Sequence, residues 1–218
     1  MIMGKRTGIA VLVMGLATAV VVEGQPGARQ VAQERRQAEA EVPRLIEELS
    51  LTPGMVVADV GAGFGAMTVV LGHWLAPEGR IFATDIGTRQ LSTIRDYVKA
   101  EGLTNVTVLE GAAASTNLPA ACCDAIFMRD VYHHVTEADA FNASLVAALK
   151  PGGRLAVIDF RPDPGSRLFP GVNTNRGGHG VPPAIVVDEL SAAGLTHVKT
   201  IEGWPDAKGN LFLGLFQK

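Results

Sequence analysis

The chain has 218 residues, of which 47% are hydrophobic and 19% charged, so it is long enough for one sizeable domain and too short for two large ones. Its formal net charge is −3 at pH 7, and its pI is about 5.9. Nucleic-acid-binding domains usually carry a basic patch or a pI above about 9. We therefore expect no DNA or RNA partner.

Residues 1–30 have the pattern of a secretory signal or an N-terminal anchor. Lys5 and Arg6 precede an uncharged run over residues 8–22, and residues 17–19 form an A-x-A cleavage site. The run is short for a membrane span of about 20 residues. We expect an exported protein, periplasmic or secreted, or one that touches the membrane only through this segment. The alternative is a cytoplasmic protein with a mis-assigned start.

Residues 31–49 form an N-terminal helix or linker, and residues 50–218 form the main domain. The segment from residue 28 to residue 49 is rich in good helix formers. Its second half carries an apolar stripe at helical spacing, which should pack on the domain. Its first half is expected to be a solvated linker or an extension of the same helix.

Strands and helices alternate through the middle of the chain. Five segments read as strands: residues 55–60, 80–85, 106–109, 125–129 and 155–160. Between them, helices are expected over residues 66–75, 88–100 and 137–149. This alternation favours a parallel, doubly wound sheet with right-handed crossovers.

The last part of the chain breaks this alternation. A connection over residues 161–182, rich in glycine and proline, is long for a structureless loop and typical of a lid, where Arg161 or Arg176 could hold an acidic group of a substrate. A helix over residues 183–193 follows, and then two strands that no helix separates, which must pair antiparallel. The expected fold is α/β, with a mostly parallel seven-stranded sheet, a C-terminal antiparallel hairpin and helices on both faces.

The two cysteines of the chain, Cys122 and Cys123, are adjacent. A disulfide between them would close a strained ring, and two thiols without further ligands make a poor metal site. We expect two unlinked, half-buried residues at the start of a strand, and no metal.

A glycine-rich turn follows the first strand. Asp59 ends that apolar strand, and Gly61, Gly63 and Gly65 allow a sharp turn and a close approach of the backbone to a ligand. The next helix would point its N-terminal N–H groups at that ligand. The same letters also satisfy the dinucleotide fingerprint, so two cofactor classes remain open at this point.

Asp85 ends the second strand. A carboxylate there can accept both hydroxyls of a ribose, as the acidic residue about 20 positions after the turn does in dinucleotide folds. Asp85 is therefore compatible with either cofactor.

Four features together resemble the class I S-adenosylmethionine-dependent methyltransferases, over residues 42–218. They are the acidic-x-G-x-G-x-G motif at residues 59–65, Asp85, the segment 149–155 that leads into the fifth strand, and the final helix with its hairpin. The resemblance implies S-adenosylmethionine as the cofactor and methyl transfer to a small-molecule acceptor.

The resemblance also implies a set of cofactor-binding residues around the ends of the first four strands. Ala112 departs from the family, since many relatives have Asp there, so a polar contact to the adenine amino group must come from elsewhere or be lost. The implied set is Asp59, Gly61, Ala62, Gly63, Gly65, Asp85, Ile86, Glu110, Gly111, Ala112 and Arg129.

Chemistry in this family is placed after the fourth strand, where the chain reads Tyr132, His133, His134. Either histidine could act as a general base on a hydroxyl, thiol or amine acceptor. Either could equally pack on a neighbouring helix. Methyl transfer to a good nucleophile depends more on positioning than on proton transfer.

Two other functions compete with methyl transfer. One is a protein that binds S-adenosylmethionine without catalysis. The other is an NAD(P)-dependent reductase of the short-chain type, which expects Lys four residues after a Tyr; neither Tyr97 nor Tyr132 has it.

Overall fold

The structure is a computed structural model that describes residues 28–163 and 165–218. The signal expected over residues 1–30 lies almost wholly outside the described residues. Within the described ranges, no helix is long and apolar enough to cross a membrane.

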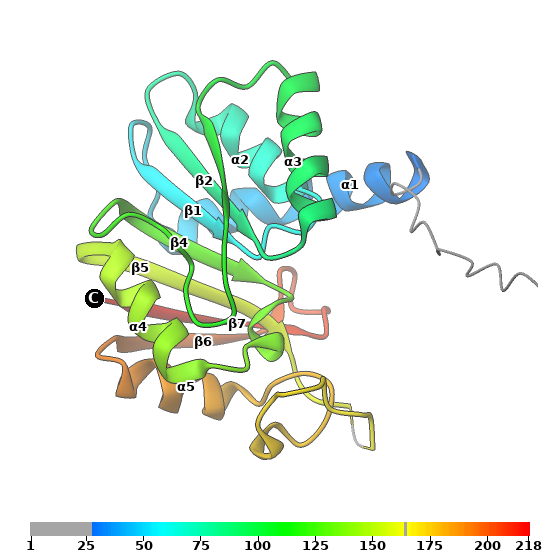
Figure 1. Ribbon diagram of the computed structural model, residues 1–218, viewed down its shortest axis with the longest axis vertical. Helices are drawn as coiled ribbons and strands as arrows, with labels where there is room; N and C mark the ends of the chain where they lie inside the picture. Colours follow the sequence, from blue (N-terminus) through cyan, green and yellow to red (C-terminus); the bar gives the residue numbers. More distant parts are fainter. Residues whose placement is uncertain (1–27, 164) are drawn as a thin grey trace, which may run out of the picture.

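A seven-stranded sheet in the order β3-β2-β1-β4-β5-β7-β6 forms the centre of the molecule (Figure 1). The first five strands pair parallel, and β7 pairs antiparallel with both β5 and β6. The predicted fold class is thereby confirmed. The strands are β1 Val56–Val60, β2 Arg80–Asp85, β3 Val106–Glu110, β4 Cys123–Arg129, β5 Leu149–Phe160, β6 Thr196–Trp204 and β7 Leu211–Gln217.

Two hydrophobic cores lie against the sheet, because successive side chains of a strand point to opposite faces. In β1, Val57 belongs to one core, while Ala58 and Val60 belong to the other. In β4, Phe127 and Ile126 divide in the same way. Burial on both sides explains why these strands read as continuous apolar runs.

The helices divide between these cores. Residues of α1 and α2 pack in the core of Val57, and residues of α4 and α5 pack in the core of Val60. A smaller cluster joins α3 to α2 and β2. The helices are α1 Ala28–Leu49, α2 Ala66–Leu75, α3 Thr88–Ala100, α4 Ala138–Ala148 and α5 Pro183–Ala192, with short 3-10 turns η1 Tyr132–His134 and η2 Thr174–Arg176.

The helix α1 is continuous, and its contacts begin before the predicted apolar stripe. Ala38 is buried in the same core as Val42 and Leu45. Glu41 is also buried, and its carboxylate accepts hydrogen bonds from Arg129 Nη2 at 2.9 Å and from the indole N–H of Trp204 at 3.2 Å. An ion pair and an indole therefore join α1 to the ends of β4 and β6.

Cys122 and Cys123 are linked by a disulfide. The prediction of two unlinked residues is wrong. Ala121 has a positive φ of 47°, so the chain turns immediately before β4 begins at Cys123. The pair thus lies at the junction of a turn and a strand.

Candidate functional site

The glycine-rich turn joins β1 to α2 at the carboxyl edge of the parallel strands. Gly61, Gly63 and Gly65 have φ values of 76°, 57° and 85°, a region that favours glycine. A Cβ on Gly61 would lie 2.5 Å from Cγ2 of Val131, so this position has no room for a side chain. A Cβ on Gly63 would meet no protein atom within 4 Å, because Gly63 borders open space.

Asp85 holds this turn and the start of α3 together. Its Oδ2 accepts the backbone N–H of Gly63 at 3.0 Å, and its Oδ1 accepts that of Gly87 at 2.9 Å. A carboxylate oxygen has two lone pairs, so each oxygen can still accept a second hydrogen bond. Asp85 also lines a cavity, and it can therefore receive two hydroxyls there.

A cavity of about 490 Å³ lies over the ends of β1, β2 and β4. One end is formed by the turn, by Asp85 and by the segment after β3, and the other end is formed by His134 and Phe169. The remaining lining residues are Val60, Gly61, Gly63, Thr84, Ile86, Gln90, Gly111, Ala112, Ala113, Ser115, Thr116, Met128, Asp130, Val131, Val135, Thr136 and Phe141.

A second cavity of about 370 Å³ lies on the other side of the turn, beneath α1. Gly61, Gly63 and Asp130 line both cavities, so the two are neighbours. The first half of α1, predicted as a linker or a helix extension, contributes Glu34, Gln37 and Ala38 to this second cavity. The other lining residues are Asp59, Ala62, Phe64, Ala66, Met67 and Arg129.

Asp59 is buried at the base of the smaller cavity. Its Oδ2 accepts the hydroxyl of Thr68 at 2.6 Å. Burial disfavours the charged form and raises the pKa of Asp59 to about 7, against the opposing effect of the Thr68 hydrogen bond. A cation entering this cavity would favour the ionised form.

Comparison with known proteins agrees with this geometry. A family model described as a methyltransferase domain matches residues 58–157, which span β1 to β5 and carry the turn, Asp85 and the histidine pair. Residues 58–157 therefore have the sequence of a methyltransferase domain.

Among curated relatives, the ubiquinone/menaquinone biosynthesis C-methyltransferase UbiE of Shewanella piezotolerans is 31% identical over 116 residues. This match covers 53% of the chain and 46% of the relative, so the chain matches about half the length of such methyltransferases.

Two solved structures share the methyltransferase fold. An S-adenosylmethionine-dependent methyltransferase from Aquifex aeolicus superposes with a TM-score of 0.68 at 22% identity, over 86% of this chain and 97% of that one. The phosphoethanolamine N-methyltransferase 2 of Haemonchus contortus, in complex with S-adenosyl-L-methionine, gives a TM-score of 0.62 at 19% identity, over 79% of this chain and 40% of that one.

The residues present fit the cofactor of a methyltransferase. The glycine turn and Asp85 face the larger cavity, with open space at Gly63 where a backbone can approach a ligand. Gly111 and Ala112 line the same cavity, and so does Ile86, whose side chain is 68% exposed although it is apolar. A flat apolar ring would cover that exposed side chain.

Two residues of the predicted cofactor set have other surroundings. Glu110 is exposed at the end of β3 and lies outside both cavities. Arg129 lines the smaller cavity, but its guanidinium is paired with Glu41 and lies 3.7 Å from the carboxylate of Asp130. The Arg129 charge is thus largely paired within the protein, and this pair holds α1 over the smaller cavity.

Tyr132 is fully buried, away from the cavity. Its hydroxyl donates to Glu189 Oε2 at 2.8 Å and accepts from Asn142 Nδ2 at 2.8 Å. Burial raises the pKa of Tyr132 well above its usual value. Arg176 is buried over the tyrosine ring and donates to the same Glu189 at 3.0 Å. Both residues therefore join η1 and the loop to α5, and neither is free to act on a substrate.

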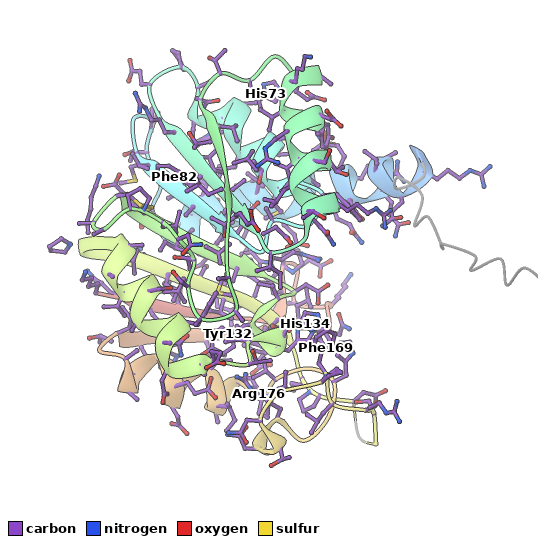
Figure 2. All side chains as sticks on the ribbon, in the orientation of Figure 1. His73, Phe82, Tyr132, His134, Phe169 and Arg176 are labelled. Carbon is purple, nitrogen blue, oxygen red and sulfur yellow. A yellow bond between two sulfur atoms is a disulfide. The ribbon has the colours of Figure 1, made fainter. Side chains whose placement is uncertain are left out.

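The two histidines of η1 have different environments. His133 is buried, and its Nδ1 lies 2.9 Å from Asp159 Oδ1. His134 is half-buried and lines the larger cavity beside Phe169, with 4.3 Å between the ring centroids, and Figure 2 shows these two side chains together. Burial and then the neighbouring histidines lower the pKa of His134 to about 4, so its imidazole is neutral at pH 7.

Sequence reasoning missed Asp159, which contacts His133 of the predicted catalytic pair. This carboxylate stands at the end of β5 inside an otherwise apolar run, as Asp59 and Asp85 stand at the ends of β1 and β2. An acidic residue at the carboxyl end of a buried strand was the signal that could have found it. Arg161, also expected to contact a substrate, instead pairs with Glu202 at the surface.

Proposed function

We propose that this protein transfers a methyl group from S-adenosylmethionine to a small-molecule acceptor. The observation that carries the proposal is the single cavity that runs from Asp85 and the glycine turn to His134 and Phe169. The end at Asp85 has carboxylate oxygens that can accept hydrogen bonds from ribose hydroxyls. The glycine turn there lets the backbone approach a nucleoside closely. The second end of the cavity has room and apolar side chains beside the place where the fourth strand ends.

Residues at different places in the two cavities would bind different parts of the cofactor. Asp85 would hold the ribose hydroxyls, and Ile86 would cover the adenine. Asp59 and the smaller cavity would receive the amino-acid end, whose ammonium would favour the ionised carboxylate. When bound, S-adenosylmethionine supplies a methyl group on a positively charged sulfur, which a nucleophilic acceptor removes.

The acceptor would enter at the end formed by Val135, Phe141 and Phe169. These side chains are apolar, so they favour an acceptor with an apolar or aromatic body. Holding the acceptor atom in line with the methyl group supplies most of the rate enhancement that methyl transfer to a good nucleophile requires. The role of His133 or His134 as a general base stays a prediction, and a pKa near 4 makes His134 a weak base.

Isothermal titration calorimetry of the full chain with S-adenosylmethionine, S-adenosylhomocysteine and NADH tests the cofactor. We expect the first two to bind and Gly63→Val to abolish their binding, because its side chain would fill open space that borders both cavities. Binding of NADH in their place would favour the reductase.

Release of S-adenosylhomocysteine with a panel of small-molecule acceptors tests the reaction. We expect acceptor-dependent release from the wild-type protein and none from Gly63→Val. Tight cofactor binding without release for any acceptor would instead favour a protein that binds S-adenosylmethionine without catalysis.

We also propose that residues 1–30 direct export or anchor the protein, with membrane contact only through that segment. The supporting pattern is the basic start, the uncharged run and the small-residue cleavage site. A reporter fused to residues 1–30, compared with the same fusion carrying Lys5→Glu and Arg6→Glu, should be exported only in its unaltered form. A reporter that stays in the cytoplasm in both forms would reject the proposal.

A further inference from the structure

Three of the five histidines of the chain meet at the His134 end of the larger cavity. His133 and His134 come from η1, and His179 comes from the loop between β5 and α5. Each ring offers one nitrogen, and these three nitrogens lie within 4.8 Å of one another. The ring centroids of His133 and His179 are 4.8 Å apart, and those of His134 and His179 are 5.9 Å apart.

His133 is held in the orientation of a metal ligand. Its Nδ1 bonds to Asp159, a carboxylate with no exposed surface, and its backbone N–H donates to the other oxygen of Asp159 at 3.0 Å. This leaves Nε2 as the free ring nitrogen. Metal-binding histidines almost always bond through their second nitrogen to a carboxylate, carbonyl or water, which fixes the tautomer.

His134 has a nitrogen that lacks a partner. Its Nδ1 is buried, and none of the described residues forms a hydrogen bond with it. A buried polar atom left without a partner costs about 1–3 kcal/mol. A cation bound by this nitrogen would remove that cost.

His179 is fixed in place although its side chain is exposed. Its backbone N–H donates to Ser166 Oγ at 2.8 Å, and its carbonyl accepts the N–H of Asp163 at 3.2 Å. On either side of it, a Cβ on Gly178 or Gly180 would lie 2.8 Å from the opposite part of the loop. The loop is therefore closely packed around His179, which presents its ring toward η1.

We propose that His133, His134 and His179 bind one divalent transition-metal ion of the zinc class. Neutral imidazoles suit such ions, and three protein ligands leave a fourth position for water or a substrate. Zinc–nitrogen bonds of 2.0–2.1 Å place tetrahedral ligands about 3.4 Å apart. Binding would therefore draw the loop that carries His179 closer to η1.

The charges around the cluster favour a cation. The carboxylate of Asp130, which lines both cavities, lies within 4.8 Å of a His133 nitrogen and an oxygen of Asp159. Because His134 lines the larger cavity, the open position of the ion would be reachable from it. Resting on the proposed function, an acceptor with a thiol or hydroxyl group would bind the ion there and be held for methylation.

The metal alone tests the site. After dialysis of the full chain against a chelator, titration with Zn²⁺ should give one ion per chain, and Co²⁺ should give the visible absorption of a tetrahedral site. His179→Ala should weaken Zn²⁺ binding at least about 100-fold, because it removes one of three ligands. The matched control is His197→Ala, an exposed histidine next to Thr200 in β6, which should bind as the wild type does.

A second variant separates the site from loss of folding. Asp159→Asn keeps the shape of the side chain but loses the charge behind His133, and should weaken Zn²⁺ binding about 10–100-fold. Equal Zn²⁺ affinity of His179→Ala and the wild type would overturn the proposal, as would the absence of one-to-one binding. S-adenosylhomocysteine binding by the same samples reports on the proposed function separately.

Discussion

Asp159 and His133 are joined by two hydrogen bonds, one to the ring at 2.9 Å and one to the backbone N–H at 3.0 Å. Asp159 is the penultimate residue of β5, and His133 lies in η1 just after β4, so a buried carboxylate joins the ends of two neighbouring strands. A third hydrogen bond, from the backbone N–H of Phe160, completes its surroundings. His133 is thus held by the carboxyl edge of the sheet.

Asp85→Asn should weaken binding of S-adenosylhomocysteine by roughly 10–100-fold, because hydrogen bonds to a charged group contribute about 1.5–3 kcal/mol. The variant keeps the shape of the side chain, but its uncharged amide has one acceptor oxygen in place of two. It therefore accepts hydrogen bonds from the N–H groups of Gly63 and Gly87 and from two ribose hydroxyls less well than the carboxylate does. Calorimetric titration measures the change. Asp139→Asn, an exposed carboxylate in the first turn of α4, is the control and should bind normally. Normal binding by Asp85→Asn would reject the assigned ribose contact.

Tyr132→Phe should lower the free energy of unfolding by about 1–3 kcal/mol, because Asn142 and Glu189 lose a buried partner. Cofactor binding should not change, since the hydroxyl lies outside the cavity. Urea denaturation followed by circular dichroism measures the loss. Tyr97→Phe is the matched control, because that hydroxyl accepts a part-buried hydrogen bond from Arg35 Nη1 at 3.2 Å, and its loss should cost less than about 1 kcal/mol. Impaired cofactor binding by Tyr132→Phe would contradict a purely structural role.

Glu41→Ala should release α1 from the domain. Removing this buried carboxylate leaves Arg129 and the Trp204 indole without their partner, which should cost about 2–4 kcal/mol. Limited proteolysis should then cut within residues 28–49 faster than in the wild type. The control is Glu39→Ala on the same helix, whose exposed pair with Arg35 should contribute less than about 0.5 kcal/mol. Equal cleavage of the two variants would show that Glu41 does not hold α1.

The stability of the protein should depend on Asp59 in a defined pH range. Its pKa is about 7 in the folded protein and ordinarily 3.8, so between these values the folded state binds more protons than the unfolded state. The neutral carboxyl of Asp59 therefore makes its full contribution to the free energy of unfolding below pH 3.8. This contribution is lost as the pH rises toward 7, by at most about 1.4 kcal/mol per pH unit.

Urea denaturation of the wild type and of Asp59→Asn at several pH values measures this dependence. The variant keeps an oxygen that can accept from Thr68 but cannot ionise. We expect the difference in stability between wild type and variant to decrease as the pH is raised from 5 to 7. A difference that stays constant over this range would mean that Asp59 is ionised throughout it.

Much of the architecture could be predicted from the pattern of residues. Buried parallel strands read as apolar runs, and the two closing strands had to pair antiparallel because no helix separates them. Strand β5 was predicted too short, since its first residues pair through Leu149 with Cys123 before an irregularity in the register. Pairing across such an irregularity depends on the neighbouring strand, which local pattern does not contain.

The site was predicted less completely, because its contacts join segments far apart in the chain. Asp85 and the glycine turn lie within one strand–helix–strand unit, so spacing alone could place them together. By contrast, Glu41 pairs with Arg129, which lies 88 residues later in the sequence. No local pattern in the α1 segment predicts that partner. His179 lies in the connection over residues 161–182, and no motif there marks it.

The sequence by itself determined the fold class and the place of the glycine turn and Asp85, because these depend on short motifs and on the periodicity of apolar residues. Only the tertiary structure decided which polar side chains share a buried space. It placed Tyr132 and Arg176 with Glu189 and brought His179 beside His133 and His134. The physical reason is that a buried polar group must find a partner wherever packing brings one, and packing is set by the whole chain.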